Sequence, residues 1–437
     1  MRFVVTLLFL VSPFVTCIVN NTKLLIGTKI SLQYESLKET LRHRLQYSFN
    51  ESHHDEATFD YKRIKYNPQL SAKTFYDLYE VTSTPVVIET PNISYWSSNH
   101  HQQWNAAFFK KHCGNALARI RIGHSISAPI LEWELYYVKL SLYIDFLQGV
   151  LSTLSIDNGS IIVTDPNLTY LFDWPLSMCP NVVLDQFVLP RYFANDLLTL
   201  CEGCPFNEND WPSLFIGSSN MNPRSSQLHR DTFGSAFFSI QLVGNKIWRI
   251  FNRNDVSFLY PSLQDDVHFD ITNVYSTEQQ LKYPLLKFAR FVDIHVRPGE
   301  LLYVPAGLPH QVIVNKDTND EDDNKITIMI GMNFVSLANI NSVIEATQPK
   351  PLLYAFQDRI NFTADDAFKK YNGQHEILYT KQKYQLLYDF FVKHQYEFQH
   401  VIDWDVTHQP WRQFQRRKLE YVKPYLRDTF REKYFEK

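Results

Sequence analysis

Residues 237–251 of the chain read FFSIQLVGNKIWRIF. Two apolar segments, residues 237–242 and 246–251, flank a Val-Gly-Asn turn. A Gly-Asn turn between two such segments is typical of a tight β-hairpin. We therefore expect two neighbouring strands here, paired through a short connection.

Further short strands are expected on both sides of this hairpin, because apolar runs alternate with turn residues. Downstream, strands are expected at residues 291–296, 300–304, 311–314 and 326–334. Upstream, a strand is expected at residues 84–89, a helix at 104–112 and a strand at 118–122. This pattern predicts a mainly β protein with some α, built on a double-sheet jelly roll or barrel. From about residue 349, apolar residues at helical spacing predict a helical C-terminal region.

The composition of the whole chain is that of a globular protein. Of its 437 residues, 45% are hydrophobic and 20% are charged. Aromatic residues reach 15%, which suits β-rich packing. A formal net charge of −3 predicts no strong field for nucleic acid, so DNA or RNA is not expected as the main partner.

The N-terminus has the pattern of a secretory signal peptide. Arg2 precedes an apolar run at residues 3–11, and Pro13 and small residues lead to Cys17. The run is too short to span a bilayer, and a buried first strand is the alternative. No transmembrane segment is expected after it. The sequence thus predicts a protein of the endoplasmic reticulum lumen or a secreted one.

Sequons and cysteines agree with an oxidising compartment. Asn-x-Ser/Thr sequons, which could make the chain a glycoprotein, occur at Asn20, Asn50, Asn92, Asn158, Asn167 and Asn361. The cysteines left after cleavage near residue 17 are Cys113, Cys179, Cys201 and Cys204. They permit two disulfides in three connectivities, with free buried thiols as an alternative. The pair Cys201 and Cys204 could also be a redox motif or half a zinc site, but no second pair accompanies it.

His229 and Asp231 are the first residues that indicate a metal site. On a strand, residues two apart face the same side, so one imidazole and one carboxylate could reach a single ion. A third ligand, His310, lies in the segment GELLYVPAGLPHQV, residues 299–312. Two His and one carboxylate form the facial triad of non-haem Fe(II) oxygenases, which leaves metal positions open for a 2-oxo acid and O₂. A structural zinc site would instead close with a fourth protein ligand.

To bind a 2-oxo acid that has a second carboxylate, the protein also needs a cationic side chain that pairs with this carboxylate. Lys246, directly after the Gly-Asn turn, could pair with that carboxylate. The alternative is an ordinary hairpin lysine in solvent. His268 and His295 are further histidines, and we interpret both as packing or surface residues.

These residues fall into a longer set of motifs. The set is residues 84–88, Leu171-Phe172-Asp173, residues 189–193, His229-x-Asp231, Gly234, Gly244-x-Lys246-x-Trp248, Gly299-Glu300, Tyr303-Val304-Pro305-x-Gly307, His310-x-Val312 and Asn333-Phe334. In order and spacing it resembles the JmjC domain, especially the branch with the lysyl hydroxylase once called the phosphatidylserine receptor. The resemblance covers roughly residues 84–345. It implies a cupin-like jelly roll, a double-stranded β-helix.

The resemblance also implies roles for individual residues. His229, Asp231 and His310 would be the catalytic metal ligands for Fe(II). Lys246 would hold the far carboxylate of 2-oxoglutarate, and Ser226 and Asn333 fall where the family often has residues that assist it. O₂ is then the oxidant, with ascorbate as a supporting reductant.

Two departures from the family pattern concern the pocket. Gly331 stands where a Thr often lies two residues before the Asn, so one hydrogen bond to the co-substrate is expected to be missing or replaced. Leu308 and Pro309 replace a usually aromatic pair before the second His, which would reshape the pocket mouth.

The sequence therefore predicts four segments and one function. The segments are a signal peptide at 1–17, an N-terminal flank at 18–83, a JmjC or cupin-like catalytic domain at 84–345 and a helical region at 346–437. The expected function is a 2-oxoglutarate-dependent dioxygenase that hydroxylates a Lys, Arg or Asn side chain of a protein in the secretory pathway. The alternatives are a catalytically silent luminal interaction or folding factor, and a cupin that binds another metal or a sugar. The C-terminal helices either form a homodimer or cap the barrel.

Overall fold

A computed structural model describes the chain in several stretches. The described residues are 59–90, 103–123, 133–156, 159–189, 191–193, 196–198, 212–220, 226–262, 267–315, 325–347, 385, 387–393 and 409–410. All of them belong to one compact unit, Thr58–Lys437. The predictions for residues 1–17, for Cys201 and Cys204, for every sequon but Asn167 and for most of 346–437 lie outside the described residues.

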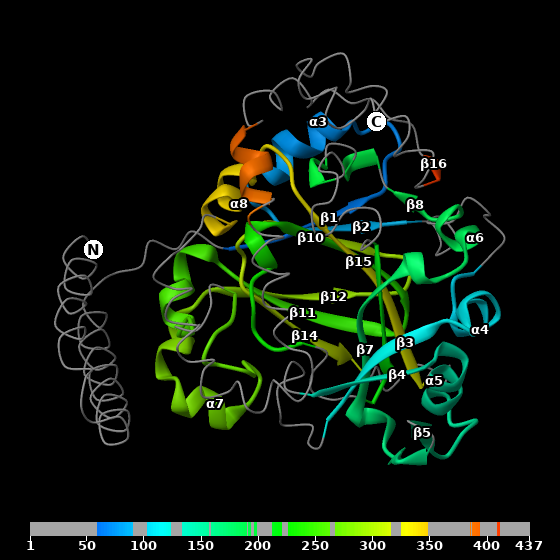
Figure 1. The fold of residues 1–437 in the computed structure, drawn as a ribbon. Helices are drawn as coiled ribbons and strands as arrows, with labels where there is room; N and C mark the ends of the chain where they lie inside the picture. The colour runs from blue at the N-terminus through cyan, green and yellow to red at the C-terminus, as the bar shows by residue number, and fades with distance from the viewer. Residues whose placement is uncertain are drawn as a thin grey trace, which may run out of the picture. The chain divides into compact units, whose positions relative to one another are not determined.

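Most strands form one large, mostly antiparallel sheet (Figure 1). Its order is β1 (Lys62–Lys65), β2 (Val86–Glu89), β13 (Leu301–Val304), β10 (Ala236–Val243), β15 (Ile326–Phe334), β9 (Ser213–Ser218), β7 (Thr169–Pro175), β3 (Leu117–Ile122) and β4 (Glu134–Lys139). β1 pairs with β2 in parallel, and the other neighbours are antiparallel. The central strands β10 and β15 are buried along their whole length, as their apolar sequences require.

A smaller sheet faces the large one. Its order is β12 (Phe291–Val296), β11 (Asn245–Phe251) and β14 (His310–Asn315). Side chains of the two sheets meet in the interior: the ring centroids of Phe237 on β10 and Trp248 on β11 are 6.1 Å apart. Two further pairs are short, β5 (Leu154–Ile156) with β6 (Ile161–Val163) and β8 (Val188–Leu189) with β16 (Gln409–Pro410).

The strands expected at 237–242 and 246–251 are both present, but the predicted hairpin is wrong. β10 pairs with β13 and β15 in the large sheet, whereas β11 pairs with β12 and β14 in the small one. Gly244 between them has φ +73°, and a Cβ there would lie 3.2 Å from the side chain of Thr327. The turn therefore carries the chain from one sheet to the other, because each strand is apolar enough to be buried against partners from elsewhere in the sequence.

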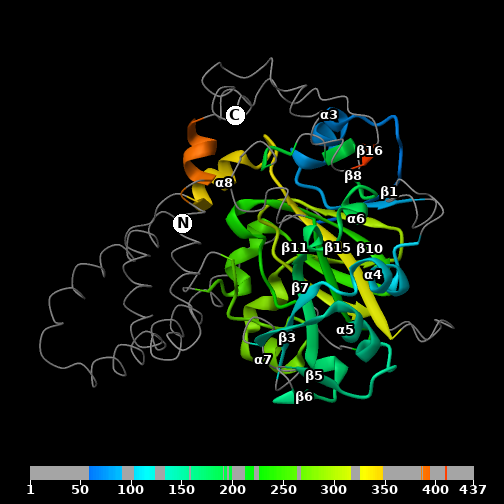
Figure 2. The same ribbon diagram turned by 45° about the vertical axis from the view of Figure 1, so that its right-hand side comes forward.

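Helices lie at the edges of the sheets (Figure 2). Among the residues that the structure describes, the labelled α-helices are α3 (Ala72–Phe75), α4 (Ala106–Cys113), α5 (Leu140–Leu147), α6 (Asn181–Leu184), α7 (Thr277–Lys282) and α8 (Ile340–Thr347), and η1 (Tyr76–Glu80) is a π-helix. The 3₁₀ helices are η5 (Pro166–Leu168), η6 (Leu176–Met178), η7 (Arg191–Phe193), η9 (Thr232–Gly234), η10 (Arg253–Leu259) and η11 (Pro284–Phe288). In the part of the chain that the structure describes, no helix is long and apolar enough to cross a membrane.

A disulfide joins Cys113, at the end of α4, to Cys179, just after η6. The helix predicted at 104–112 is confirmed as α4, and the side chain of Asn105 caps it by accepting a hydrogen bond from the amide of Phe108. Both cysteines are buried, with exposed fractions of 1% and 4%. The bond closes a loop with a sequence separation of 66 residues.

The double variant Cys113→Ser, Cys179→Ser is expected to lower the free energy of unfolding by about 2–4 kcal/mol, because the unfolded chain regains the freedom of that loop. Urea unfolding of the parent and the variant without reductant measures the difference. With reductant present, the two should unfold at the same urea concentration. An unchanged midpoint without reductant would show that the disulfide contributes little.

Candidate metal and co-substrate site

Backbone hydrogen bonds bring His229 and His310 together. The amide of His229 donates to the carbonyl oxygen of His310 at 3.0 Å, and the amide of His310 donates back at 2.8 Å. His310 is the first residue of β14, and His229 lies outside the named strands in an isolated antiparallel bridge. Residues directly opposite each other in such a pair face the same side, so both imidazoles enter one space.

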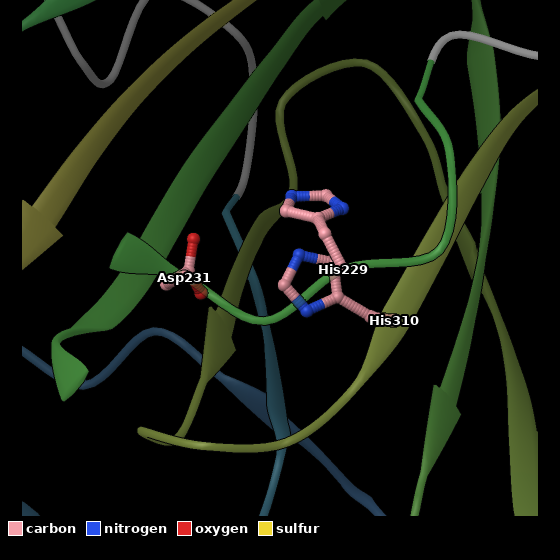
Figure 3. Close-up of side chains that lie close together, drawn as sticks. All are labelled: His229, Asp231 and His310. Carbon is pink, nitrogen blue, oxygen red and sulfur yellow. The ribbon is translucent and has the colours of Figure 1, made fainter. Parts of the chain in front are cut away.

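The ring nitrogens of both histidines are oriented by neighbouring carbonyl groups. Nδ1 of His229 lies 2.8 Å from the carbonyl oxygen of Gln227, and Nδ1 of His310 lies 3.0 Å from that of Leu308. A carbonyl only accepts, so Nδ1 carries the proton in each ring and Nε2 keeps its lone pair. The ligand atoms of His229, Asp231 and His310 all lie within 4.8 Å of one another. Figure 3 shows these three side chains close together.

Burial shifts the pKa of each member of this cluster. It raises the pKa of Asp231 to about 8 and lowers the pKa of His310 to about 4. The pKa of His229 is lowered well below its usual value, first by burial and then by the charge of His310. At neutral pH the metal-free cluster therefore holds two neutral imidazoles and a largely protonated carboxyl group. This donor set fits a divalent cation, which would displace a single proton, that of Asp231.

Metal affinity is therefore expected to depend on pH with a defined sign. Between pH 6 and pH 8, the Kd for Mn(II) should fall by about tenfold per pH unit, because each ion bound releases one proton. Above about pH 8 it should level off, since Asp231 is then already ionised. Calorimetric titration in buffers of different ionisation enthalpy measures both the Kd and the proton released. An affinity that does not vary across this range would contradict the assignment of Asp231.

Lys246 lies in the same cavity, buried to 1% exposure. Among the described residues its ammonium finds one hydrogen-bond acceptor, Sδ of Met329 at 3.7 Å. Burial lowers the pKa of Lys246 to about 7, which reflects how poorly these surroundings solvate a charge. A carboxylate placed beside Nζ would supply the missing partner, so the surroundings fit an acidic ligand. The alternative of a hairpin lysine in solvent is wrong, because the side chain points between the two sheets.

One cavity of about 270 Å³ brings together all six residues that the sequence singled out. They are Ser226, His229, Asp231, Lys246, His310 and Asn333. The hydroxyl of Ser226 accepts a hydrogen bond from the amide of Val312 at 3.0 Å, which ties it to β14. The amide nitrogen of Asn333 donates to the hydroxyl of Ser235, which holds its side chain in place on β15.

The structure gives a physical reason for Gly331. A Cβ at this position would lie 2.3 Å from Cζ of Phe237 and 3.0 Å from Cε2 of Phe215. Both rings line the cavity, so aromatic carbon occupies the space that a threonine side chain would need. By contrast, Leu308 and Pro309 are not among the cavity-lining residues, and their carbonyl groups instead accept hydrogen bonds from His310 and Phe251.

Several cavity residues escaped the sequence argument. His268 lines the cavity and forms a backbone bridge with His229, although it was expected to be a packing or surface residue. His295 is exposed on β12, as expected. Tyr170, Phe172 and Asp173 of β7 also line the cavity. Phe172 and Asp173 belong to the motif Leu171-Phe172-Asp173, but no cavity position was predicted for them, because the contact joins strands that are distant in sequence.

Comparison with known proteins agrees with this geometry. Residues 180–339 match the family model of the cupin-like domain. The chain is 28% identical to the mouse 2-oxoglutarate and iron-dependent oxygenase JMJD4 over 184 residues, which cover 41% of this chain and 39% of that protein. It is 23% identical to JmjC domain-containing protein F of Dictyostelium discoideum over 270 residues, 53% of this chain and 54% of that protein.

A third relative is the Arabidopsis thaliana lysine-specific demethylase JMJ30, 25% identical over 262 residues, which are 57% of this chain and 52% of that protein. The chain thus spans between about two fifths and just over half of the length of these curated relatives. Residues 180–339 are thus similar to the cupin-like domain and to JmjC proteins, and the antiparallel sheets are consistent with that fold.

Proposed function

We propose that the protein is an Fe(II)- and 2-oxoglutarate-dependent oxygenase. The observation that carries the proposal is that one cavity holds an open His-Asp-His cluster together with a buried lysine ammonium. The cluster matches a metal that keeps positions free for other ligands. The lysine matches a co-substrate with a carboxylate far from the metal. The relatives named as 2-oxoglutarate and iron-dependent oxygenases support the same chemistry.

The chain's own residues position and shield the reactants. Nε2 of His229, Nε2 of His310 and the carboxylate of Asp231 would hold the iron, and the carbonyl groups of Gln227 and Leu308 fix the two rings. Lys246 would bind the far carboxylate of the co-substrate. With 2-oxoglutarate and O₂, bound iron supplies the oxidation of a substrate C–H bond, with succinate and CO₂ as co-products.

The aromatic walls of the cavity would also shield the reactants. Phe215, Phe237 and Trp248 line it and would exclude water from the reacting atoms. We interpret the two facing sheets as the double-stranded β-helix of a cupin. Its interior is then the place where the ligands converge.

The substrate is proposed to be a Lys, Arg or Asn side chain of a protein in the secretory pathway. The disulfide between Cys113 and Cys179 supports an oxidising compartment, and the N-terminal signal pattern agrees. Three further expectations stay predictions: membership of the lysyl hydroxylase branch, a homodimer through C-terminal helices, and the lack of a nucleic-acid partner.

The second candidate function is a catalytically silent binding protein. It is favoured only by Gly331, where no hydroxyl is present to bind the co-substrate.

The decisive experiment measures 2-oxoglutarate turnover by the purified protein with Fe(II) and ascorbate. The matched control is the double variant His229→Ala, Asp231→Ala. Succinate formed by the parent and not by the variant supports the oxygenase. The opposite outcome is that the parent binds 2-oxoglutarate with Mn(II) but forms no succinate, either alone or with a panel of peptides. The protein would then be the catalytically silent binding protein and not an oxygenase.

A further inference from the structure

The indole nitrogen of Trp248 is a buried hydrogen-bond donor that has no acceptor among the described residues. The side chain lies on β11 with an exposed fraction of 2%, and it lines the metal cavity. An indole N–H can only donate, and buried donors in native proteins are almost always paired, because an unpaired one loses its bond to water. An acceptor that enters the cavity with a ligand would satisfy this donor.

Trp248 stands between the two groups that would hold the ends of the co-substrate. It follows Lys246 by two residues on β11, and side chains two apart on a strand face the same side, roughly 7 Å apart. In the other direction its ring lies beside the imidazole of His310, with ring centroids 5.4 Å apart. All three side chains line the same cavity. A ligand that reaches from the metal cluster to Lys246 therefore passes the side chain of Trp248.

The facing wall of the cavity explains why another donor is needed here. The ring centroid of Phe237 on β10 lies 6.1 Å from that of Trp248. The Phe237 ring also fills the space that a side chain at Gly331 would need. Neither glycine nor phenylalanine has a polar side-chain atom, so the wall at these two residues offers the far carboxylate no side-chain hydrogen bond. The indole N–H on the opposite strand can donate in its place.

We propose, resting on the function above, that Trp248 is a co-substrate-binding residue. Its indole N–H donates to an oxygen of the far carboxylate of 2-oxoglutarate, the same carboxylate that pairs with Lys246. Lys246 supplies the opposite charge and Trp248 a second donor, and hydrogen bonds to an ionised acceptor are stronger than those between neutral groups. The bond from Trp248 replaces the one that Gly331 cannot make.

Calorimetric titration of the Mn(II)-loaded protein with two ligands tests the proposal. 2-Oxoglutarate has a far carboxylate, whereas oxalate chelates a metal ion and has none. Trp248→Phe should weaken the binding of 2-oxoglutarate about tenfold, which corresponds to one charge-assisted hydrogen bond. It should change the affinity for oxalate by less than about twofold, because the metal ligands are untouched.

Trp174→Phe is the matched control for the loss of an indole group. Trp174 is also buried, but its indole nitrogen donates to the carbonyl oxygen of Leu117, and the residue is not among those that line the cavity. This variant should bind both 2-oxoglutarate and oxalate as the parent does.

A second measurement observes the hydrogen bond in the parent itself. The protein is labelled with ¹⁵N in the indole groups and loaded with Zn(II), which is diamagnetic and suits magnetic resonance. Trp248 is the one tryptophan among the described residues that line the cavity. One indole N–H signal should therefore move downfield with 2-oxoglutarate and much less with oxalate, and that signal should be missing from Trp248→Phe.

The outcomes separate this proposal from the function on which it rests. If the metal-loaded parent does not bind 2-oxoglutarate, the oxygenase itself is contradicted. If the parent binds it and Trp248→Phe binds it equally well, or loses oxalate to the same extent, Trp248 has no hydrogen bond to the far carboxylate. Indole signals that do not move in the parent would lead to the same conclusion.

Discussion

Replacing Lys246 with methionine is expected to weaken 2-oxoglutarate binding on the order of 100-fold. The ammonium is buried to 1% exposure and has a thioether as its hydrogen-bond acceptor. It is therefore preorganised for a carboxylate, and its removal would leave that carboxylate in an apolar space without a counter-charge. Methionine has nearly the same length and volume as lysine, so the packing between the sheets should be preserved.

Calorimetric titration of 2-oxoglutarate into Mn(II)-loaded protein measures this effect without turnover. Lys325→Met is the matched control, because Lys325 is exposed and lies directly before β15. It should bind the co-substrate as the parent does. If Lys246→Met bound 2-oxoglutarate with the affinity of the parent, the far carboxylate would have to lie elsewhere in the cavity.

Replacing His310 with alanine is expected to weaken Mn(II) binding by on the order of 100-fold or more. Loss of a residue that merely orients a metal ligand already costs about 10- to 100-fold, so loss of a ligand should cost at least as much. The imidazole of His310 is fixed beside the other two ligands, because its backbone pairs with His229 and its Nδ1 is held by the carbonyl oxygen of Leu308.

Equilibrium dialysis against Mn(II) tests this directly. His295→Ala is the matched control, since His295 is exposed on β12 in the same small sheet. The two variants should differ in metal affinity, with that of His295→Ala equal to that of the parent. Equal affinity of the two variants would mean that the ion does not bind at the His-Asp-His cluster.

Much of this architecture was predictable from local patterns. The strands β10, β11, β12 and β15 lie within one or two residues of the positions that apolar runs and turn residues indicate. The spacing of His229 and Asp231 and the context of His310 also predicted a metal cluster, which the structure brings within 4.8 Å. These features are local, because strand propensity and turn chemistry depend on neighbours in the sequence.

The pairing of the strands was not predictable in the same way. The Gly-Asn turn predicted that β10 and β11 pair, yet each joins a different sheet. A short turn constrains only the direction of the chain. Because a strand that is buried on both of its faces needs apolar neighbours on each side, it pairs with strands that are far away in sequence. The same reason explains why the cavity positions of Asp173 and His268 were not predicted. Both reach the cavity through pairings with distant strands and segments.

The sequence by itself determined the ligand set, the cation at Lys246 and the alternation of short strands, because these follow from residue type and spacing. Only the tertiary structure decided that Phe215 and Phe237 fill the space beside Gly331, and that Tyr170, Phe172 and Asp173 of β7 line the cavity. Side-chain volume in a shared interior and the pairing of distant strands arise from contacts among several strands. No single segment contains that information.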